Sequence, residues 1–249
     1  MAASGGAADA VLILDQVVAG YGPITILNGT SFAVRPGTIT TVIGPNGAGK
    51  STVFKAIFGL LKVRSGHIRF DGEDVSGQPP ARLIARGITY VPQGRNVFPE
   101  ISVRHNLELG AVAIPGVTDL DGRIERAMDR FPMLRAKADA QASTLSGGQQ
   151  KILEVARGLM LEPKLVLIDE PSIGLSPLMV QEVFQILKDL RARGVTILLI
   201  EQNARSALSI SDEAIVLEQG QTRMHDTAQA ILADPRVGQL FLGGHAEPA

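Results

Sequence analysis

The chain has 249 residues, of which 45% are hydrophobic and 20% are charged, and its formal net charge at pH 7 is −1. This length allows one large α/β domain or two small ones with a sizeable core, and the near-neutral charge argues against nucleic acid as a partner. The absence of cysteine excludes disulfides, cysteine nucleophiles and thiolate metal ligands.

Both ends of the chain are expected to be flexible tails, over residues 1–10 and 244–249. The N-terminal sequence MAASGGAADA has neither a basic segment nor a long apolar core, so it does not have the pattern of a signal peptide. The longest apolar runs reach only about half the length that a membrane span requires. A location on the cytoplasmic side is therefore expected.

Short β-like runs alternate with helix-like segments between the tails. Strands are predicted within 11–19, 30–34, 38–44, 67–77, 87–93, 164–170 and 195–201, and a closing hairpin within 213–225. Gly220 is expected in the turn of that hairpin. Helices are predicted over 50–62 and 178–192, and helical spacing dominates from Ser102 to Met160, with breaks at Pro115 and Pro132.

This order predicts one α/β domain over residues 11–243, with a mostly helical insert at about 78–163. Strands that alternate with helices favour a mostly parallel sheet, whose ligands lie at the carboxyl ends of its strands. Four polar sequences follow predicted strands at such ends: GPNGAGKST, VPQG, IDEP and IEQN. Their common position predicts one shared site.

The sequence GPNGAGKST matches the phosphate-loop pattern G-x-x-x-x-G-K-[ST], between a predicted strand and a predicted helix. Its residues are Gly44, Pro45, Asn46, Gly47, Ala48, Gly49, Lys50, Ser51 and Thr52. Glycines let backbone amides turn inward around phosphate oxygens, and the helix N-terminus adds a positive dipole. Lys50 is expected to reach the β- and γ-phosphates, and the Ser51 hydroxyl to bind Mg²⁺. This pattern predicts binding of a nucleoside triphosphate.

Two carboxylates end the apolar strand KLVLIDE. Asp169 is expected to hold Mg²⁺ through its water shell, and Glu170 to orient and polarise an attacking water. The alternative is a solvated strand end.

The sequence LSGGQ precedes a predicted helix, and its last four residues are Ser146, Gly147, Gly148 and Gln149. Read locally, Ser146 is an N-cap that two glycines help the chain to enter. Read functionally, a hydroxyl and two unobstructed amides at a helix start form a second anion site. Both interpretations remain open.

In the order and spacing of these motifs the sequence resembles the ATP-binding subunits of ABC transporters, from about Val11 to Gly243. The resemblance implies a P-loop ATPase core with an N-terminal antiparallel β portion and an inserted helical subdomain. It also implies a dimer in which LSGGQ of one subunit closes on the γ-phosphate held by the other. Tyr21 would stack on adenine, although an exposed turn aromatic is the alternative, and Gln93 would touch Mg²⁺ and relay contact with membrane subunits.

Two positions depart from the commonest pattern of that family. Ser176 stands where an Asp is usual, and Gln202 stands where a His that senses the γ-phosphate is usual. The Gln202 amide can donate a hydrogen bond to a phosphate oxygen but carries no charge. Hydrolysis at the site built on this phosphate loop is therefore expected, with weaker γ-phosphate sensing.

The sequences DEPSIGLSP, IEQNARSAL, YVPQGRNVFP and LFLGG resemble the second ATP-binding subunit of high-affinity branched-chain amino acid importers. Such importers pair two different ATP-binding subunits with two membrane permease subunits and a periplasmic solute-binding protein. ATP-driven closure of the ATP-binding dimer would power alternating access of the membrane subunits. The chain would then lie peripherally on the inner membrane, with ATP and Mg²⁺ as ligands.

Other interpretations remain open at this stage. Phe98, Pro99 and Ile101 follow Gln93 and are expected either to dock a short helix of a membrane subunit or to pack the insert onto the core. A soluble ABC ATPase of translation or DNA repair usually has two cassettes or a coiled-coil insertion, and neither is seen. A nucleotide-dependent assembly module with little hydrolysis, or an importer subunit for urea or amides, is the alternative function.

Overall fold

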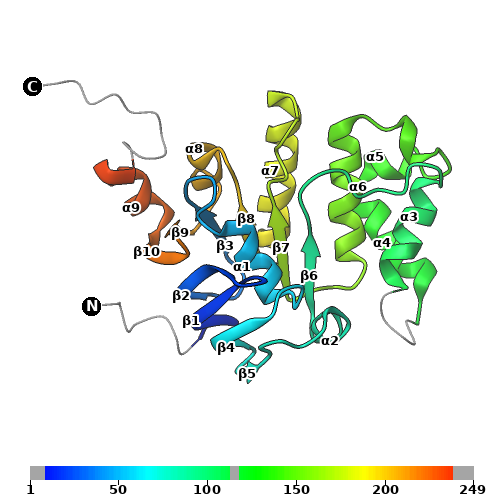
Figure 1. Ribbon diagram of the computed structural model, residues 1–249. Coiled ribbons are helices and arrows are strands. Elements are labelled where there is room, and N and C mark those ends of the chain that lie inside the picture. Colours follow the sequence, from blue (N-terminus) through cyan, green and yellow to red (C-terminus); the bar gives the residue numbers. More distant parts are fainter. Residues whose placement is uncertain (1–8, 113–117, 238–249) are drawn as a thin grey trace, which may run out of the picture.

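The computed structural model describes residues 9–112 and 118–237, which form two β-sheets and several groups of helices (Figure 1). The expected break at Pro115 and most of the two expected tails lie outside these residues.

The first sheet has four antiparallel strands in the order β2-β1-β4-β5. Their bounds are Leu12–Tyr21 for β1, Ile24–Val34 for β2, Val63–Phe70 for β4 and Glu73–Asp74 for β5. The strand predicted at 30–34 is therefore longer and starts at Ile24. The pairing of β1 with β2 shifts register three times, and these irregularities break the alternation from which the strand would have been recognised.

The second sheet has six strands in the order β10-β9-β3-β8-β7-β6. Their bounds are Ile39–Ile43 for β3, Ile88–Val91 for β6, Leu165–Asp169 for β7, Thr196–Ile200 for β8, Glu213–Glu218 for β9 and Gln221–Thr227 for β10. Neighbouring strands from β9 to β6 are parallel, and only β10 is antiparallel. The predicted mostly parallel sheet is confirmed. Every residue of β3, β7 and β8 is buried, as in sheets that are covered on both faces.

Helices cover both faces and the edges of this sheet. Their bounds are Lys50–Ile57 for α1, Pro80–Arg86 for α2, Val103–Ala111 for α3, Leu120–Arg130 for α4, Pro132–Arg135 for α5, Gly147–Leu159 for α6, Pro177–Ala192 for α7, Ala204–Leu208 for α8 and Ala228–Ala233 for α9. Figure 1 shows α3 to α6 gathered at one end of the molecule, beyond β6, and α9 at the other. The expected insert at 78–163 thus contains these helices, but it also contains β6, which is the edge strand of the six-stranded sheet.

Alternate residues of the central strands face two separate parts of the core. Leu198 and Ile200 of β8 pack in a cluster that contains α1 and the antiparallel sheet. Ile197 and Leu199 pack in a cluster that contains α3, α6 and α7. Val183, Leu187 and Leu190 of α7, within the helix predicted over 178–192, are all buried in this second cluster. The sheet is thereby held rigid under the loops at its carboxyl end.

Candidate functional site

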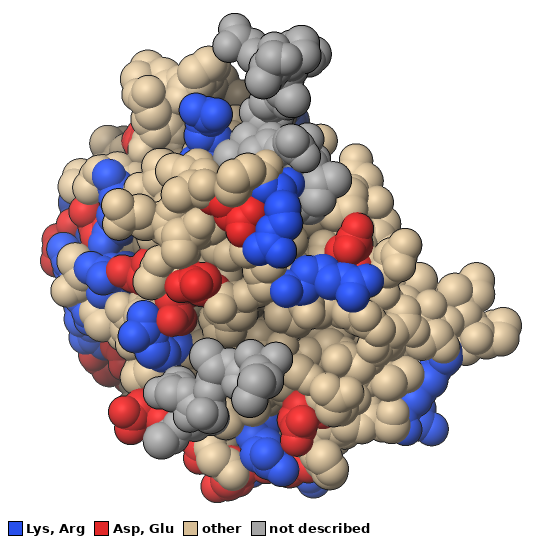
Figure 2. Space-filling model, turned by 90° about the vertical axis from the view of Figure 1, so that its left-hand side faces the viewer, with Lys and Arg blue, Asp and Glu red and all other residues tan. Residues whose placement is uncertain are grey.

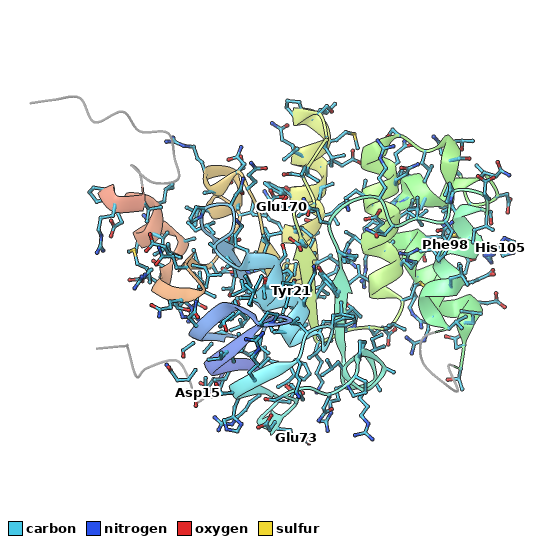
Figure 3. All side chains as sticks on the ribbon, viewed as in Figure 1. Asp15, Tyr21, Glu73, Phe98, His105 and Glu170 are labelled. Atoms are coloured by element: carbon cyan, nitrogen blue, oxygen red, sulfur yellow. The ribbon has the colours of Figure 1, made fainter. Side chains whose placement is uncertain are left out.

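The carboxyl ends of β3, β8 and β7 adjoin, as the parallel register requires. Ile200 pairs with Val42 on one side and with Asp169 on the other. The segments that follow these strands, which begin at Gly44, Glu170 and Glu201, therefore leave one edge of the sheet together. Figure 3 shows Glu170 at this edge, above Tyr21 in the same view.

Residues 44–49 form a tight loop between β3 and α1. Gly47 and Gly49 have φ angles of 81° and 101°, in the left-handed region that glycine adopts without strain. A Cβ atom at Gly44 would lie 2.2 Å from the carbonyl oxygen of Leu217, so only glycine fits there. An added Cβ at Gly47 would meet no atom within 4 Å apart from those of its chain neighbours, so the turn is open at this residue.

Lys50 is buried at the start of α1 and points back to the loop. Its Nζ donates hydrogen bonds to the carbonyl oxygens of Gly44 at 2.8 Å and Pro45 at 3.1 Å. Burial lowers the pKa of this amine, whereas the nearby carboxylates of Glu170 and Asp169 act in the opposite direction. The positively charged amine, held against two carbonyls, is suited to phosphate oxygens. The two carboxylates near it are suited to a divalent cation.

Asp169 ends β7 and is 2% exposed. Its carboxylate accepts hydrogen bonds from the Ser51 hydroxyl at 3.4 Å and from the Tyr90 hydroxyl at 3.2 Å. Burial raises the pKa of Asp169, and these two hydrogen bonds oppose the shift. Ser51 and Asp169, both expected as metal ligands, are thus brought together. Tyr90 was not expected in the site, and its one signal was a phenol within the strand GITYVPQ.

Glu170 is the first residue after β7 and has a φ of 47°. Its backbone amide donates to the carbonyl of Ile200 at 2.8 Å, and its Oε2 accepts from the Gln93 side-chain amide at 2.8 Å. Burial, and secondly the negative charge of Asp169, raise the pKa of Glu170. The structure therefore places Gln93, which was expected at Mg²⁺, in contact with Glu170.

Gln202 follows β8 and its side chain is exposed. It borders an open hollow of about 500 Å³ whose polar lining includes Glu170, Ser172, Glu201 and Arg205. Its backbone amide donates to the carboxylate of Glu201 at 3.2 Å. Gln202 and Glu170 therefore face the same space from neighbouring strand ends.

Ser146 is the N-cap of α6 and forms a reciprocal capping box with Gln149. The Gln149 amide donates to the Ser146 hydroxyl at 3.3 Å, and the Ser146 amide donates to Gln149 Oε1 at 3.1 Å. A Cβ atom at Gly148 would lie 2.1 Å from the Met179 side chain. Among the described residues no hydrogen bond joins 145–149 to the phosphate loop. Ser146 thus has a local capping role and is exposed.

Tyr21 ends β1 and is 43% exposed. The Nζ atom of Lys55 on α1 lies 5.6 Å from the centre of its ring. This geometry leaves one face of the phenol ring available beside the helix that starts at the phosphate loop. Both of its interpretations, adenine platform and exposed turn aromatic, are compatible with that position.

A model of the family described as ABC transporter matches residues 27–173, which include the phosphate loop, LSGGQ and both carboxylates. The chain belongs to the ABC transporter family. Membership makes it an ATP-binding subunit whose ATP hydrolysis is coupled to transport, as the sequence predicts. Among the described residues no helix has both the length and the apolar composition needed to cross a bilayer.

Several ABC proteins resemble this subunit over almost their whole length. The high-affinity branched-chain amino acid transport ATP-binding protein BraG of Pseudomonas aeruginosa is 42% identical over 234 residues, which cover 94% of this chain and 100% of that protein. The probable branched-chain amino acid transport ATP-binding protein LivF of Archaeoglobus fulgidus is 38% identical, with coverage of 90% and 95%. The ADP conformation of MJ1267, an ATP-binding cassette of an ABC transporter, superposes with a TM-score of 0.84 at 31% identity, with coverage of 94% and 99%.

Proposed function

We propose that this ABC subunit is the ATP-hydrolysing motor of an importer for branched-chain or other hydrophobic amino acids. The observation that carries the solute class is the identity of 42% to BraG along that protein's full length. The sequences DEPSIGLSP and IEQNARSAL, which resemble those of branched-chain amino acid importers, contain Glu170 and Gln202. The resemblance therefore extends to the residues proposed to lie nearest the reaction. A position on the cytoplasmic face of the inner membrane follows from this role.

The phosphate loop fits a triphosphate because its open turn, its buried Lys50 and the N-terminus of α1 meet at one place. Residues 44–52 would bind the phosphates, and Tyr21 would support the base. Ser51, Asp169 and Gln93 offer the oxygen ligands that Mg²⁺ prefers. When bound, Mg²⁺ would neutralise the charge that develops between the β- and γ-phosphates.

Glu170 would act on the attacking water. A bond forms between the water oxygen and the γ-phosphorus while the bond to the β–γ bridging oxygen breaks, and ADP leaves. The proton of the water passes to Glu170, whose pKa is raised by burial and by Asp169. Lys50 holds the γ-phosphate, and Gln202 donates an uncharged hydrogen bond to it.

A second subunit would complete the site. The exposed Ser146 hydroxyl and the amides of Gly147 and Gly148 would cover the nucleotide held by the partner, and Gln149 would keep that helix start in place through its capping bond. The partner is a second ATP-binding subunit or another copy of this chain. Closure would bury phosphate charge between two helix ends, where electrostatic interactions are strong.

Permease docking is proposed at a groove of about 430 Å³ between β6 and the helices α3 and α6. Three large apolar side chains are exposed there: Phe98, Leu109 and Val112. The Arg157 guanidinium lies 5.3 Å from the centre of the Phe98 ring, and its Nη1 is buried without a hydrogen-bond partner among the described residues. An apolar groove with an unused donor fits a short amphipathic helix that brings an acceptor. The periplasmic solute-binding protein would act through the permeases.

An assembly module that binds ATP and hydrolyses little is the second candidate. The observation in its favour is that Gln202 supplies no charge and, among the described residues, no side-chain hydrogen bond to Glu170. Hydrolysis is favoured because Glu170, the residue proposed to act on the water, is present and is held by a hydrogen bond from Gln93.

Replacement of Glu170 by Gln tests the motor function. We expect phosphate release in the complete transporter to fall by roughly 10²- to 10⁴-fold, because the proton acceptor is lost, while ATP still binds. Uptake of labelled leucine should fall with it. Glu73→Gln is the matched control, because Glu73 makes a surface ion pair with Arg86 on the antiparallel sheet, remote from Glu170 in Figure 3. Unchanged turnover in Glu170→Gln would contradict the motor role, and uptake of urea in place of leucine would contradict the solute class.

A further inference from the structure

Glu201 is a buried carboxylate in the site to which neither the sequence patterns nor the proposed mechanism gives a role. It follows β8 directly and is 1% exposed. Its Oε1 accepts from the Ser172 backbone amide at 2.9 Å, and its Oε2 accepts from the Ser172 hydroxyl at 2.7 Å and from the Gln202 backbone amide at 3.2 Å. Burial raises the pKa of this carboxyl, and the three donors oppose the shift.

The three donors belong to the two segments that carry the reacting side chains. Ser172 lies two residues after Glu170, and the Ile173 amide donates to the Glu170 carbonyl at 3.3 Å, so this stretch is one tight turn. Gln202 lies on the next segment of the edge. The two segments are also joined by the Glu170 amide, which donates to Ile200 at 2.8 Å. The Glu201 side chain therefore links, through its hydrogen bonds, the two segments whose residues are proposed to face the γ-phosphate.

A carboxyl group satisfies this arrangement. It offers acceptors to all three donors, whereas a glutamine amide offers one oxygen and adds two donors of its own. With glutamine, the Ser172 hydroxyl could turn to accept, but one of the two backbone amides would lose its acceptor. A buried carboxyl group that forms no ion pair among the described residues is costly to retain. Packing alone therefore does not account for a glutamate at this position.

We propose that Glu201 is a positioning residue for ATP hydrolysis, which fixes the Glu170 segment and Gln202 to each other through Ser172. It touches no reacting atom. Its effect falls on the chemical step, because its hydrogen bonds fix the positions of Glu170 and Gln202. They do not affect how the phosphate loop binds ATP. This inference rests on the proposed roles of Glu170 and Gln202.

Glu201→Gln is the variant that tests the proposal, since it keeps the volume of the side chain. We expect kcat to fall about tenfold, which corresponds to ~1.4 kcal/mol, with KM for ATP within about twofold of the wild type. Hydrogen exchange in the full-length chain should quicken at the amides of Ser172 and Gln202 and stay unchanged in the phosphate loop. Ser172→Ala keeps the backbone link and should lower kcat less, by about threefold. In Glu201→Ala, the further change Ser172→Ala should have no added effect.

Asp212→Asn is the control for loss of a partly buried carboxylate that links two segments of the chain. Asp212 accepts from the Ile39 backbone amide at 2.9 Å and pairs with Arg191, at the opposite ends of the strands. It should lower the unfolding midpoint and leave kcat unchanged at a temperature where the chain is folded. The proposal is overturned if Glu201→Gln keeps the wild-type kcat, or if Asp212→Asn lowers kcat as much. Turnover that survives Glu170→Gln would instead refute the proposed function.

Discussion

At the scale of single residues, the proposed contact between Gln202 and the γ-phosphate can be tested directly. It shares a hollow with Glu170 and its side chain is exposed, so a group that enters the hollow can meet both residues. An uncharged hydrogen bond contributes ~1 kcal/mol. Gln202→Ala should therefore lower turnover about fivefold, and Gln202→His should equal or exceed the wild type because imidazole can carry charge.

Phosphate-release assays on the three forms at saturating ATP check this expectation. Gln185→Ala is the matched control, because Gln185 is an exposed glutamine of α7 whose side chain, within residues 9–112 and 118–237, hydrogen-bonds to Asp189 alone. If Gln202→Ala left turnover unchanged while Glu170→Gln abolished it, Gln202 would have no role in the chemistry.

The sequence drew attention to Lys50, Ser51 and Asp169 because each stands at a fixed spacing within one local motif. It could not indicate that Tyr90 bonds Asp169, or that Ser172 bonds Glu201, since those contacts join different strands. Which side chains meet across a sheet edge depends on strand order and on the direction of each Cβ. Neither follows from spacing along a single chain.

At the scale of elements, the long buried strands and α7 were predictable, and the short elements were not. β7 and β8 are apolar runs apart from one terminal residue each, β3 is a short buried run with two threonines, and α7 has an apolar stripe. The two-residue β5 and the five-residue α8 have too few residues to show a period. The helix predicted over 50–62 ends at Ile57 because Gly59 adopts a φ of 70°, where an added Cβ would clash with the Gln78 carbonyl.

The hairpin of β9 and β10 joins the phosphate loop to the antiparallel sheet. Its two turn residues, Gln219 and Gly220, both have positive φ, as the predicted tight turn requires. The Gly220 amide donates to Ala48 at 2.9 Å, and its carbonyl accepts from the Asn28 amide at 2.9 Å and the Thr30 hydroxyl at 2.6 Å. The hairpin therefore holds the phosphate loop in place through residues that lie outside the loop's own motif.

Gly220→Ala should be one of the most destabilising single methyl additions in the chain. The new Cβ would lie 1.8 Å from the Ile26 carbonyl oxygen, in addition to the strain of a φ of 72°. We expect a loss of ~3 kcal/mol or more in the free energy of unfolding, measured by urea denaturation. Gly72→Ala isolates the strain alone, since Gly72 has a φ of 78° and no atom within 4 Å of the added Cβ; it should cost ~1 kcal/mol. Equal losses in the two variants would show that the close approach at Gly220 does not matter.

At the scale of the whole molecule, the distribution of charge and of apolar side chains defines two kinds of surface. Figure 2 shows Lys and Arg interspersed with Asp and Glu on the face near α9, without a basic stripe. Exposed apolar side chains gather instead at the groove of Phe98, Leu109 and Val112, beside the helices at the other end. The position of this groove could not be predicted in full, because β6 and α6 contribute to it from distant parts of the sequence.

A charge placed in that groove should separate ATP turnover from membrane attachment. Leu109 is 43% exposed and lines the groove, so Leu109→Glu puts a carboxylate where an apolar helix face would dock, at little expense to the fold. We expect the fraction of the chain that sediments with membranes containing its permeases to fall at least tenfold. ATP turnover of the chain alone should be unchanged, because Leu109 takes no part in the hydrogen bonds of Lys50 or Glu170. Leu232→Glu on α9, where Leu232 is 39% exposed, controls for an added surface charge at the opposite end and should sediment as the wild type does. Equal sedimentation of all three forms would place the permease contact elsewhere on the molecule.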